Sequence, residues 1–569
     1  MRRNHAIFFF ALTGLLAAAQ SDAAITIDLS YVDQQSQQYQ RFHDWVDEAV
    51  DGNPDYGFSA TDAATMYRIT GEPQYATLAV AMVEQQVSDA EAAIANGDAP
   101  EVAGDSYLYV GDLIGDLAIT YDWCSAFVTS GQRTRWAAYA AQAISNVWDP
   151  GNAQWGGQPF PWSGWSIDDP ANNYFYSFLE ATMLWTLADD SAPWMNFLDT
   201  VKIPELTAYF AGIDGGSQEG TGYGLSHKRL VYLYRIWRDS TGTDLANAND
   251  HLTDTIAWWI HATMPTLDRT AAIGDQARVS EPIMYDYHRA LMLEAHRMTL
   301  DPTAQSIASW WLHSISVGEM QSGFNFREDL LPAGSGGAPP ADLVYHALAT
   351  GHLFARTGWD THAMWMEFDA GPYLQSHAHQ DQGSFTLYRD GWLAVTENIW
   401  SHSGIQQGTD VHNVLRFEHN GDVVAQSPGT ISTMSVTPGG GGTVHAVGDL
   451  TPAYDGDPAV QSWTRTIDFI GTTLTVHDQY ATGSGTAAIF QIDVPVQPVI
   501  SGNTASAGSL SITVLSPANA TLHAVDWTTV DGDFNSGWRI DVSGGAGDYL
   551  VVLGSAESTG DEIFADGFE

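Results

Sequence analysis

A histidine-rich stretch at residues 376–381 holds the residue types that could do chemistry. It reads Ser-His-Ala-His-Gln-Asp. On a β-strand, side chains two positions apart share a face, so His377, His379 and Asp381 are expected to project together. Such a trio suits metal binding or acid–base catalysis. Exposed polar residues on an ordinary strand would give the same pattern, so the spacing alone leaves both interpretations open.

Two other segments offer partners for these histidines. His412 follows about 33 positions after His379 and could lie beside it, although a histidine bonded within the core would read the same. Residues 215–224 are rich in glycine, which lets backbone approach a ligand closely. Tyr223 stands there near the start of a helical pattern, where the helix dipole favours an anion. The segment lacks the Lys-Ser/Thr of a phosphate loop, and a flexible turn is the alternative.

A third segment, Asn172-Asn173-Tyr174, begins another helical pattern. Asparagine at such a position is often only a helix N-cap, because its side chain accepts a hydrogen bond from the first turn. Taken alone, this segment therefore indicates a helix start and leaves a role in binding open.

Helical periodicity runs from about residue 35 to 330. One apolar face follows the spacing i, i+3, i+4, i+7 and i+8, at Tyr75, Leu78, Ala79, Met82 and Val83. Further helices are predicted at about 107–128, 132–148, 172–188, 200–211, 222–240, 246–262, 283–298 and 304–317. Helix pairs joined by short turns are typical of an α/α toroid or a helical array.

The second half changes to a period of two, as in residues 384–388 and 473–476, which is typical of an antiparallel sandwich. The predicted fold class is therefore α+β and multidomain. An α/α toroid, an incomplete helical barrel, is expected at 24–330, a linker at 331–350 and an antiparallel β-sandwich at 351–556.

Both ends of the chain suggest export. Residues 1–23 are predicted to be a signal peptide, because Arg2 and Arg3 precede a short apolar run and a small-residue cleavage pattern. The tail at 557–569 resembles a short tag found on some exported bacterial proteins. We expect a secreted or periplasmic bacterial protein with no membrane span after cleavage. Cys124 is the only cysteine, so internal disulfides and multi-cysteine metal sites are excluded.

The charge excludes one class of partner. The formal net charge is -47, and lysine occurs only at Lys202 and Lys228. Nucleic acid is therefore not expected as a partner, because its affinity depends on many basic contacts to phosphates. The 21 Trp and 23 Tyr residues suit stacking on sugar rings and ordinary cores equally well.

Taken together, these segments resemble the heparinase II/III-like polysaccharide lyases over most of the mature chain. The most specific part is His377-x-His379-x-Asp381-x-x-Ser384-Phe385, followed by Gly391-Trp392-Leu393-Ala394-Val395 and His412-Asn413. Arg356-Thr357-Gly358-Trp359 precedes it, and Tyr121-Asp122-Trp123 with Gln132-Arg133 matches in the helical half. The resemblance implies a toroid followed by a sandwich, with β-elimination at a uronic acid of an acidic polysaccharide or oligosaccharide.

The resemblance also implies roles for individual residues. Asn173 matches the asparagine that contacts the substrate carboxylate, and Tyr223 the tyrosine that acts as general acid or base. His377 matches the histidine that assists charge neutralisation or proton abstraction. His379 and His412 match metal ligands, usually for zinc, and Glu219 falls within the substrate-binding region. Elimination needs these functions because the C5 proton is barely acidic until the neighbouring carboxylate is neutralised.

Two positions depart from the family pattern. The family often has histidine where this chain has Tyr174, so a substrate contact from Tyr174 itself, His227 or Arg229 is the expected replacement. The metal-binding aspartate is expected at about Thr396. Glu397 is next to it, and a β-bulge could turn its side chain toward the site. A structural zinc held by His379, His412 and Glu397 is therefore the expectation.

Two other functions stay open. A glycoside hydrolase on a toroid would need two carboxylates about 5–10 Å apart, for which Asp168 or Asp169 with Glu219 are the candidates. A non-catalytic glycan-binding protein is the other alternative. For a lyase, alginate is the leading polymer, because scarce lysine fits dense sulfation poorly. The oligomeric state is left open.

Overall fold

The computed structural model describes residues 24–276 and 279–555. The predicted signal peptide at 1–23 and tail at 557–569 lie outside the described residues. Within the described ranges, no helix has the length and apolar character needed to cross a bilayer.

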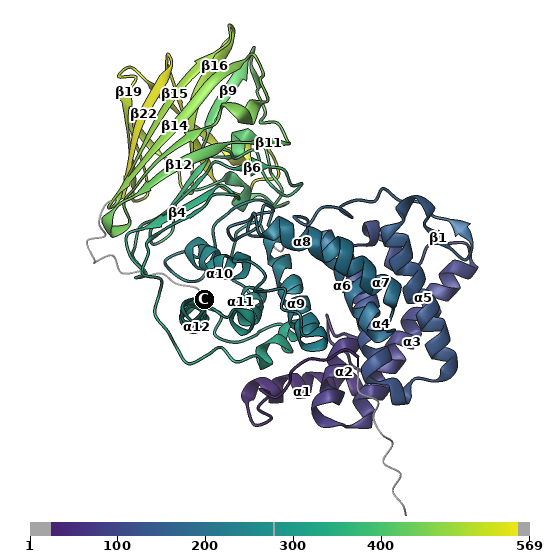
Figure 1. Ribbon diagram of the computed structural model, residues 1–569. Helices are drawn as coiled ribbons and strands as arrows, with labels where there is room; N and C mark the ends of the chain where they lie inside the picture. Colours follow the sequence, from purple (N-terminus) through teal and green to yellow (C-terminus); the bar gives the residue numbers. More distant parts are fainter. Residues whose placement is uncertain (1–23, 277–278, 556–569) are drawn as a thin grey trace, which may run out of the picture.

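The first half is helical, as predicted, and its helices form an arc of packed pairs (Figure 1). The helices are α1 (Gln37–Val50), α2 (Ala60–Thr70), α3 (Pro73–Ala95), α4 (Val110–Trp123), α5 (Ser130–Trp148), α6 (Asn173–Ala188), α7 (Ala192–Phe197), α8 (Ile203–Phe210), α9 (His227–Thr241), α10 (His251–Ala262), α11 (Asp286–Met298) and α12 (Pro302–Ser314). In α3, the predicted apolar face is the one that packs inward, with Tyr75, Ala79 and Val83 fully buried. The helical core is built on such faces.

The first sheet joins the two halves. Its order is β3-β4-β5-β7-β8, all antiparallel, from β3 (Val344–Ala347), β4 (His352–Arg356), β5 (Trp365–Asp369), β7 (Phe385–Tyr388) and β8 (Trp392–Ala394). Every residue of β4, β5 and β7 is buried, because one face packs on the helices and the other on the remaining strands. Phe354 belongs to the helical core, and its neighbours Leu353 and Ala355 to the sandwich core. Alternate residues of β4 therefore face two different hydrophobic cores.

Two further antiparallel sheets complete the sandwich. One has the order β10-β9-β16-β21-β20, from β9 (Leu415–His419), β10 (Asp422–Val423), β16 (Thr486–Val494), β20 (Thr521–Asp526) and β21 (Trp538–Ser543). The other has the order β12-β13-β14-β15-β22-β19-β18-β17, from β12 (Thr433–Pro438), β13 (Val444–Asp449), β14 (Val460–Ile470), β15 (Thr473–Thr482), β17 (Val499–Ser501), β18 (Thr504–Ala507), β19 (Leu510–Ser516) and β22 (Asp548–Ser555). Their apolar faces enclose one shared core.

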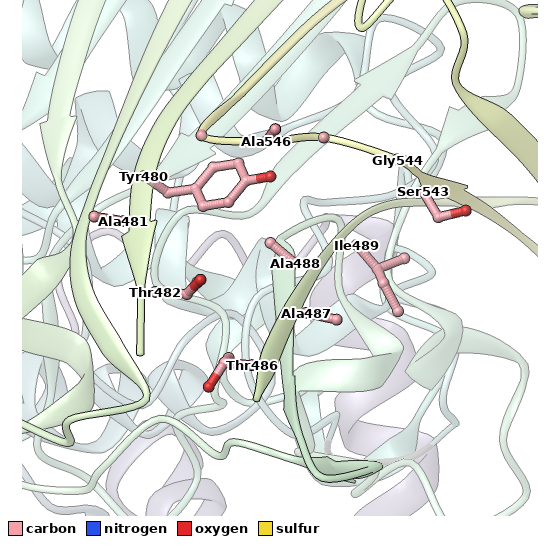
Figure 2. Close-up of a pocket in the computed structure, with 12 residues that line it drawn as sticks. Tyr480, Ala481, Thr482, Thr486, Ala487, Ala488, Ile489, Ser543, Gly544 and Ala546 are labelled. Carbon is pink, nitrogen blue, oxygen red and sulfur yellow. The ribbon is translucent and has the colours of Figure 1, made fainter. Parts of the chain in front are cut away.

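An open groove of about 460 Å³ lies among the ends of β15, β16, β21 and β22. Figure 2 shows the Tyr480 ring, Thr482 and Thr486 along it, with the loop through Ala546 beside the ring. None of the candidate site residues lines this groove.

The junction between the halves is built by buried polar contacts. The Arg356 guanidinium donates to the carbonyls of His261 and Thr263 at 2.8 and 2.7 Å, and the Trp365 indole donates to the same His261 carbonyl at 2.8 Å. The Tyr345 hydroxyl, on β3, donates to the carbonyl of Asp214 at 2.8 Å. These contacts hold the sheet against the helices. Because β3 begins at Val344, the last residues of the predicted linker at 331–350 are already part of the sandwich.

Candidate functional site

The histidine stretch lies in a loop between β6 (Pro372–Tyr373) and β7, and the expectation of a strand there was wrong. The Ala378 amide donates to the Gln375 carbonyl at 3.2 Å, and the Ser384 amide donates to the Asp381 carbonyl at 2.7 Å. These tight turns replace the ladder of a strand, so strand alternation does not set the directions of the side chains. His377 and His379 nevertheless converge, because both reach the same acid.

That acid is Asp275, which the sequence analysis missed. His377 Nδ1–H donates to Asp275 Oδ2 at 2.9 Å, and His379 Nε2–H donates to Oδ1 at 2.9 Å. Asp275 is only 3% exposed. Burial alone would raise its pKa, but the hydrogen bonds from His377 and His379 outweigh burial and lower the pKa to about 2. Asp275 is therefore an ionised bridge between two histidines with different expected roles.

Close backbone packing sets Asp275 in this place. The Asp275 amide donates to the His377 carbonyl at 2.9 Å, and the Thr221 amide to the Ile273 carbonyl at 2.9 Å. Gly220 has φ +78°, and a Cβ there would lie 2.1 Å from the Ile273 carbonyl oxygen. The glycine-rich segment 215–224 thus allows three loops to pack backbone to backbone, which joins the helical half to the histidine loop.

The packing brings Tyr223 onto His377. The two rings stack in parallel, with centroids 3.5 Å apart and an interplanar angle of 6°. Burial raises the pKa of Tyr223, and the carboxylates of Asp275, Glu219 and Asp105 raise it further. The phenol therefore holds its proton at neutral pH, as a proton donor requires.

Asn173 is the first residue of α6, and Glu219 fixes that helix start. Glu219 Oε2 accepts from the Asn173 amide at 3.0 Å, and Oε1 accepts from the Asn172 side chain at 3.3 Å. The Asn172 side chain also donates to Gln375 Oε1 at 3.3 Å, which ties the helix to the histidine loop. No described residue donates a hydrogen bond to the buried Asn173 Oδ1, so this side chain has no described hydrogen-bond partner.

Glu219 itself is fully buried, and burial raises its pKa to about 8. At neutral pH Glu219 is therefore mainly protonated. One of its oxygens accepts from the Asn173 amide and the other from the Asn172 side chain. Its position supports the first turn of α6 rather than a direct substrate contact.

Tyr174 follows Asn173 and is partly exposed. Its hydroxyl donates to Asp105 Oδ1 at 3.0 Å. Burial raises the pKa of Tyr174 to about 12, and Asp105 contributes to the rise. The residue that stands where the family often has histidine is therefore a protonated phenol held by a carboxylate.

His379, Asp381 and His412 form the one group of potential metal ligands found among the described residues. Their ligand atoms all lie within 4.8 Å of one another. His379 Nδ1 and His412 Nε2 are buried without a hydrogen-bond partner. Burial lowers the pKa of His412 well below its usual value, so its ring is neutral and able to ligate. Two free imidazole nitrogens and a carboxylate fit a zinc ion, and Asp275 fixes the His379 tautomer from the second shell.

Glu397 is not part of this group, and its expected role as the third ligand is corrected to Asp381. Glu397 begins a short 3-10 turn and lies against Gly537 and beside Asp493. Burial and the Asp493 carboxyl raise the pKa of Glu397 well above its usual range. Thr396, at the expected aspartate position, donates its hydroxyl to the Val411 carbonyl at 2.9 Å. The Glu397 carboxyl therefore lies outside the ligand group of His379, Asp381 and His412.

Two expected substrate contacts have other partners. His227 is 3% exposed and packs among the rings of Tyr176, Phe210 and His251, and burial lowers its pKa to about 4. The Arg229 guanidinium pairs with Asp112 at 2.8 Å and Glu180 at 3.0 Å. Both residues lie on α9, and their positions on that helix direct their side chains toward other helices. Neither replaces the missing histidine at Tyr174.

No protein-family model and no curated protein matches the chain. Solved structures do resemble it. Heparinase III matches with a TM-score of 0.59 at 13% identity, over 95% of this chain and 81% of that one. The heparan sulfate lyase HepC from Pedobacter heparinus matches with 0.58 at 14%, over 93% and 85%. The chondroitin AC lyase of Streptomyces coelicolor A3 matches with 0.54 at 10%, over 93% and 81%.

These likenesses span nearly the whole described chain and establish the fold, an α/α toroid followed by antiparallel β-sheets. The predicted fold class is confirmed. The predicted resemblance to heparinase-type lyases is confirmed in the architecture, with heparinase III, a heparan sulfate lyase and a chondroitin AC lyase as structural neighbours.

Proposed function

We propose that this chain is a secreted polysaccharide lyase that cleaves a uronate-containing glycan by β-elimination. The observation that carries the proposal is the parallel stack of Tyr223 on His377, with Asp275 behind the imidazole. A protonated phenol and an imidazole in contact supply the acid and the base that elimination needs. The similar folds of heparan sulfate and chondroitin lyases support the same class of reaction.

Each residue then has a separate task. Asn173, whose side chain has no described hydrogen-bond partner, donates from its Nδ2 amide to the uronate carboxylate and disperses the charge that develops when C5 loses its proton. His377 donates Nδ1–H to Asp275, which leaves Nε2 to take that proton, and the carboxylate stabilises the resulting imidazolium. Tyr223 gives its proton to the departing O4. The electron pair of the C5–H bond forms the C4–C5 double bond, and the C4–O4 bond breaks.

A zinc ion at His379, Asp381 and His412 would be structural in this proposal. When bound, it would neutralise buried carboxyl charge and order the loop that carries His377. Burial and the neighbouring Asp381 and Glu367 carboxyls raise the pKa of Asp369 well above its usual range, so this corner of the sandwich is one that a cation would stabilise.

The hydrolase alternative has weaker support. Glu219 is fully buried and bonded to the start of α6, so it has no access to a glycosidic oxygen. Asp168 pairs with Lys202 at 2.7 Å, and Asp169 accepts from Gln375 at 3.1 Å. All three candidate carboxyl groups are therefore held in structural contacts.

The test is a screen of purified protein against alginate, hyaluronan, chondroitin, heparan and polyglucuronate. Only elimination creates a double bond conjugated to the carboxylate, which absorbs in the ultraviolet. We expect absorbance on at least one polymer and a loss of at least about 100-fold in kcat for Tyr223→Phe. Tyr56→Phe is the matched control, because Tyr56 is 87% exposed and its described ring contact is with Phe324, which is not a candidate site residue. New reducing ends without absorbance would instead establish a hydrolase, and binding without turnover a glycan-binding protein.

A further inference from the structure

An acidic, partly strained turn stands beside the proposed catalytic tyrosine. Asp105, Ser106 and Tyr107 are three consecutive non-glycine residues with positive φ, at 42°, 53° and 66°. Left-handed backbone is unfavourable for such residues and persists only where surrounding contacts hold it. Tyr107 supplies these contacts. Its buried ring packs on Trp162 with ring centroids 5.2 Å apart, and its hydroxyl accepts a hydrogen bond from the Trp155 indole at 3.3 Å. The turn therefore presents Asp105 in a fixed direction.

Asp105 is exposed, and its one described side-chain partner is the Tyr174 hydroxyl. A neutral phenol leaves the charge of the carboxylate in place, whereas a protonated histidine at position 174 would have cancelled it. The charge also reaches Tyr223, since Asp105 is one of three acidic side chains that raise the pKa of that phenol. The first turn of α6 thus offers substrate an amide, a phenol and a negative charge.

We propose that Asp105, fixed by Tyr174, is a specificity-determining residue that discriminates against sulfate on the sugar bound at the first turn of α6. This inference rests on the proposed lyase function and narrows its substrate class to uronans without sulfate at that subsite. A sulfate near an exposed carboxylate is repelled, whereas a sugar hydroxyl at the same place can donate a hydrogen bond to the carboxylate. The remaining chain gives no long-range compensation, since its net charge is -47.

The test compares the polymer found in the screen with the same polymer after chemical sulfation. Wild type is expected to prefer the unsulfated form. Asp105→Asn should reduce that preference, measured as the ratio of kcat/KM values, on the order of fivefold at low salt, the effect of one unit charge about 4 Å away in water. At 1 M salt the variant and wild type should agree within about twofold, because screening removes the repulsion. A merely structural role would not depend on salt.

Two variants serve as controls. Asp44→Asn makes the same charge change at a side chain that is 77% exposed on α1, and should leave the preference unchanged. Tyr174→Phe removes the hydroxyl that fixes Asp105 but keeps the Asp105 charge, so the preference should fall less than it does in Asp105→Asn.

The outcomes separate the two proposals. An unchanged ratio in Asp105→Asn, or a wild type that prefers the sulfated form, overturns this inference while the lyase stands. If no polymer is turned over, the proposed function fails, and calorimetric affinities of wild type and Asp105→Asn for the two forms decide the specificity question independently.

Discussion

Replacing Asp275 with asparagine tests the central arrangement of the site most directly. The substitution keeps the shape of the side chain and removes the charge that His377 and His379 share. Asparagine can still accept one of the two N–H groups, but its amide nitrogen then faces the other ring as a donor against a donor. His377 loses the carboxylate that fixes its tautomer and stabilises the imidazolium formed on proton abstraction.

The magnitude follows from the structure in two ways. The pKa of Asp275 is lowered from 3.8 to about 2, which corresponds to about 2 kcal/mol at 1.36 kcal/mol per unit. Loss of a carboxylate behind a metal-ligating histidine typically costs 10- to 100-fold, or about 1.4–2.7 kcal/mol. Both estimates predict that kcat falls on the order of 30-fold. Because the pKa of Asp275 is lowered, the ionised bridge is complete above about pH 4 and is lost only as pH falls toward 2, so wild type keeps the bridge throughout the range from pH 5 to 8.

The assay is initial rate by ultraviolet absorbance over that pH range, with thermal unfolding to check the fold. Asp268→Asn is the matched control, because Asp268 lies in the same segment but pairs with Arg269 at 3.0 Å, away from the histidines. We expect the control to keep its activity. If Asp275→Asn retains kcat within threefold of wild type, the bridge does not support catalysis and the assignment of His377 as base is refuted.

Two further predictions concern the metal and the buried acid. Asp381→Asn should lower the zinc content of purified protein, measured by mass spectrometry, to well below half of the wild-type value, whereas Glu397→Gln should leave it unchanged; the reverse result would restore Glu397 as the ligand. Because the pKa of Glu219 rises from 4.5 to about 8 on folding, wild type should lose stability relative to Glu219→Gln as pH rises from 4.5 to 8, by up to about 1.4 kcal/mol per pH unit. Denaturant unfolding at a series of pH values measures this slope, and parallel profiles for the two proteins would contradict it.

The architecture could be predicted because it depends on periodicity. Apolar residues recur with a period of 3.6 in the first half and of two in the second, and residues close in the sequence are enough to reveal both periods. Tyr75, Ala79 and Val83 lie on the buried face that the spacing predicts. The linker boundary was less accurate, since β3 begins at Val344 and pairs with a strand that follows it. Short strands carry little periodic signal of their own.

The site could be predicted only in part because it depends on long-range packing. Asp275 lies 102 residues before His377, and no local motif marks it. Three backbone loops bring it there, and the glycines at 220 and 274 were the available signal. Arg229 was placed correctly on a helix beside Tyr223, but its direction depends on Asp112 and Glu180, which only the fold brings together.

A strongly acidic protein that binds an acidic polymer needs a way to neutralise the substrate without a cluster of cations. In the proposed mechanism, the hydrogen-bond donors Asn173 and Tyr223 meet this need, and burial keeps the Tyr223 phenol protonated. Burial and nearby carboxylates raise the pKa of Tyr223, so the same negative field that opposes the substrate keeps the phenol protonated. Glu219, neutral for the same reason, holds Asn173 without adding a full charge. Under the proposed function, the acidity of the chain is therefore part of the mechanism: it secures the acid at O4, and through Asp105 it would admit uronate sugars and reject their sulfated forms.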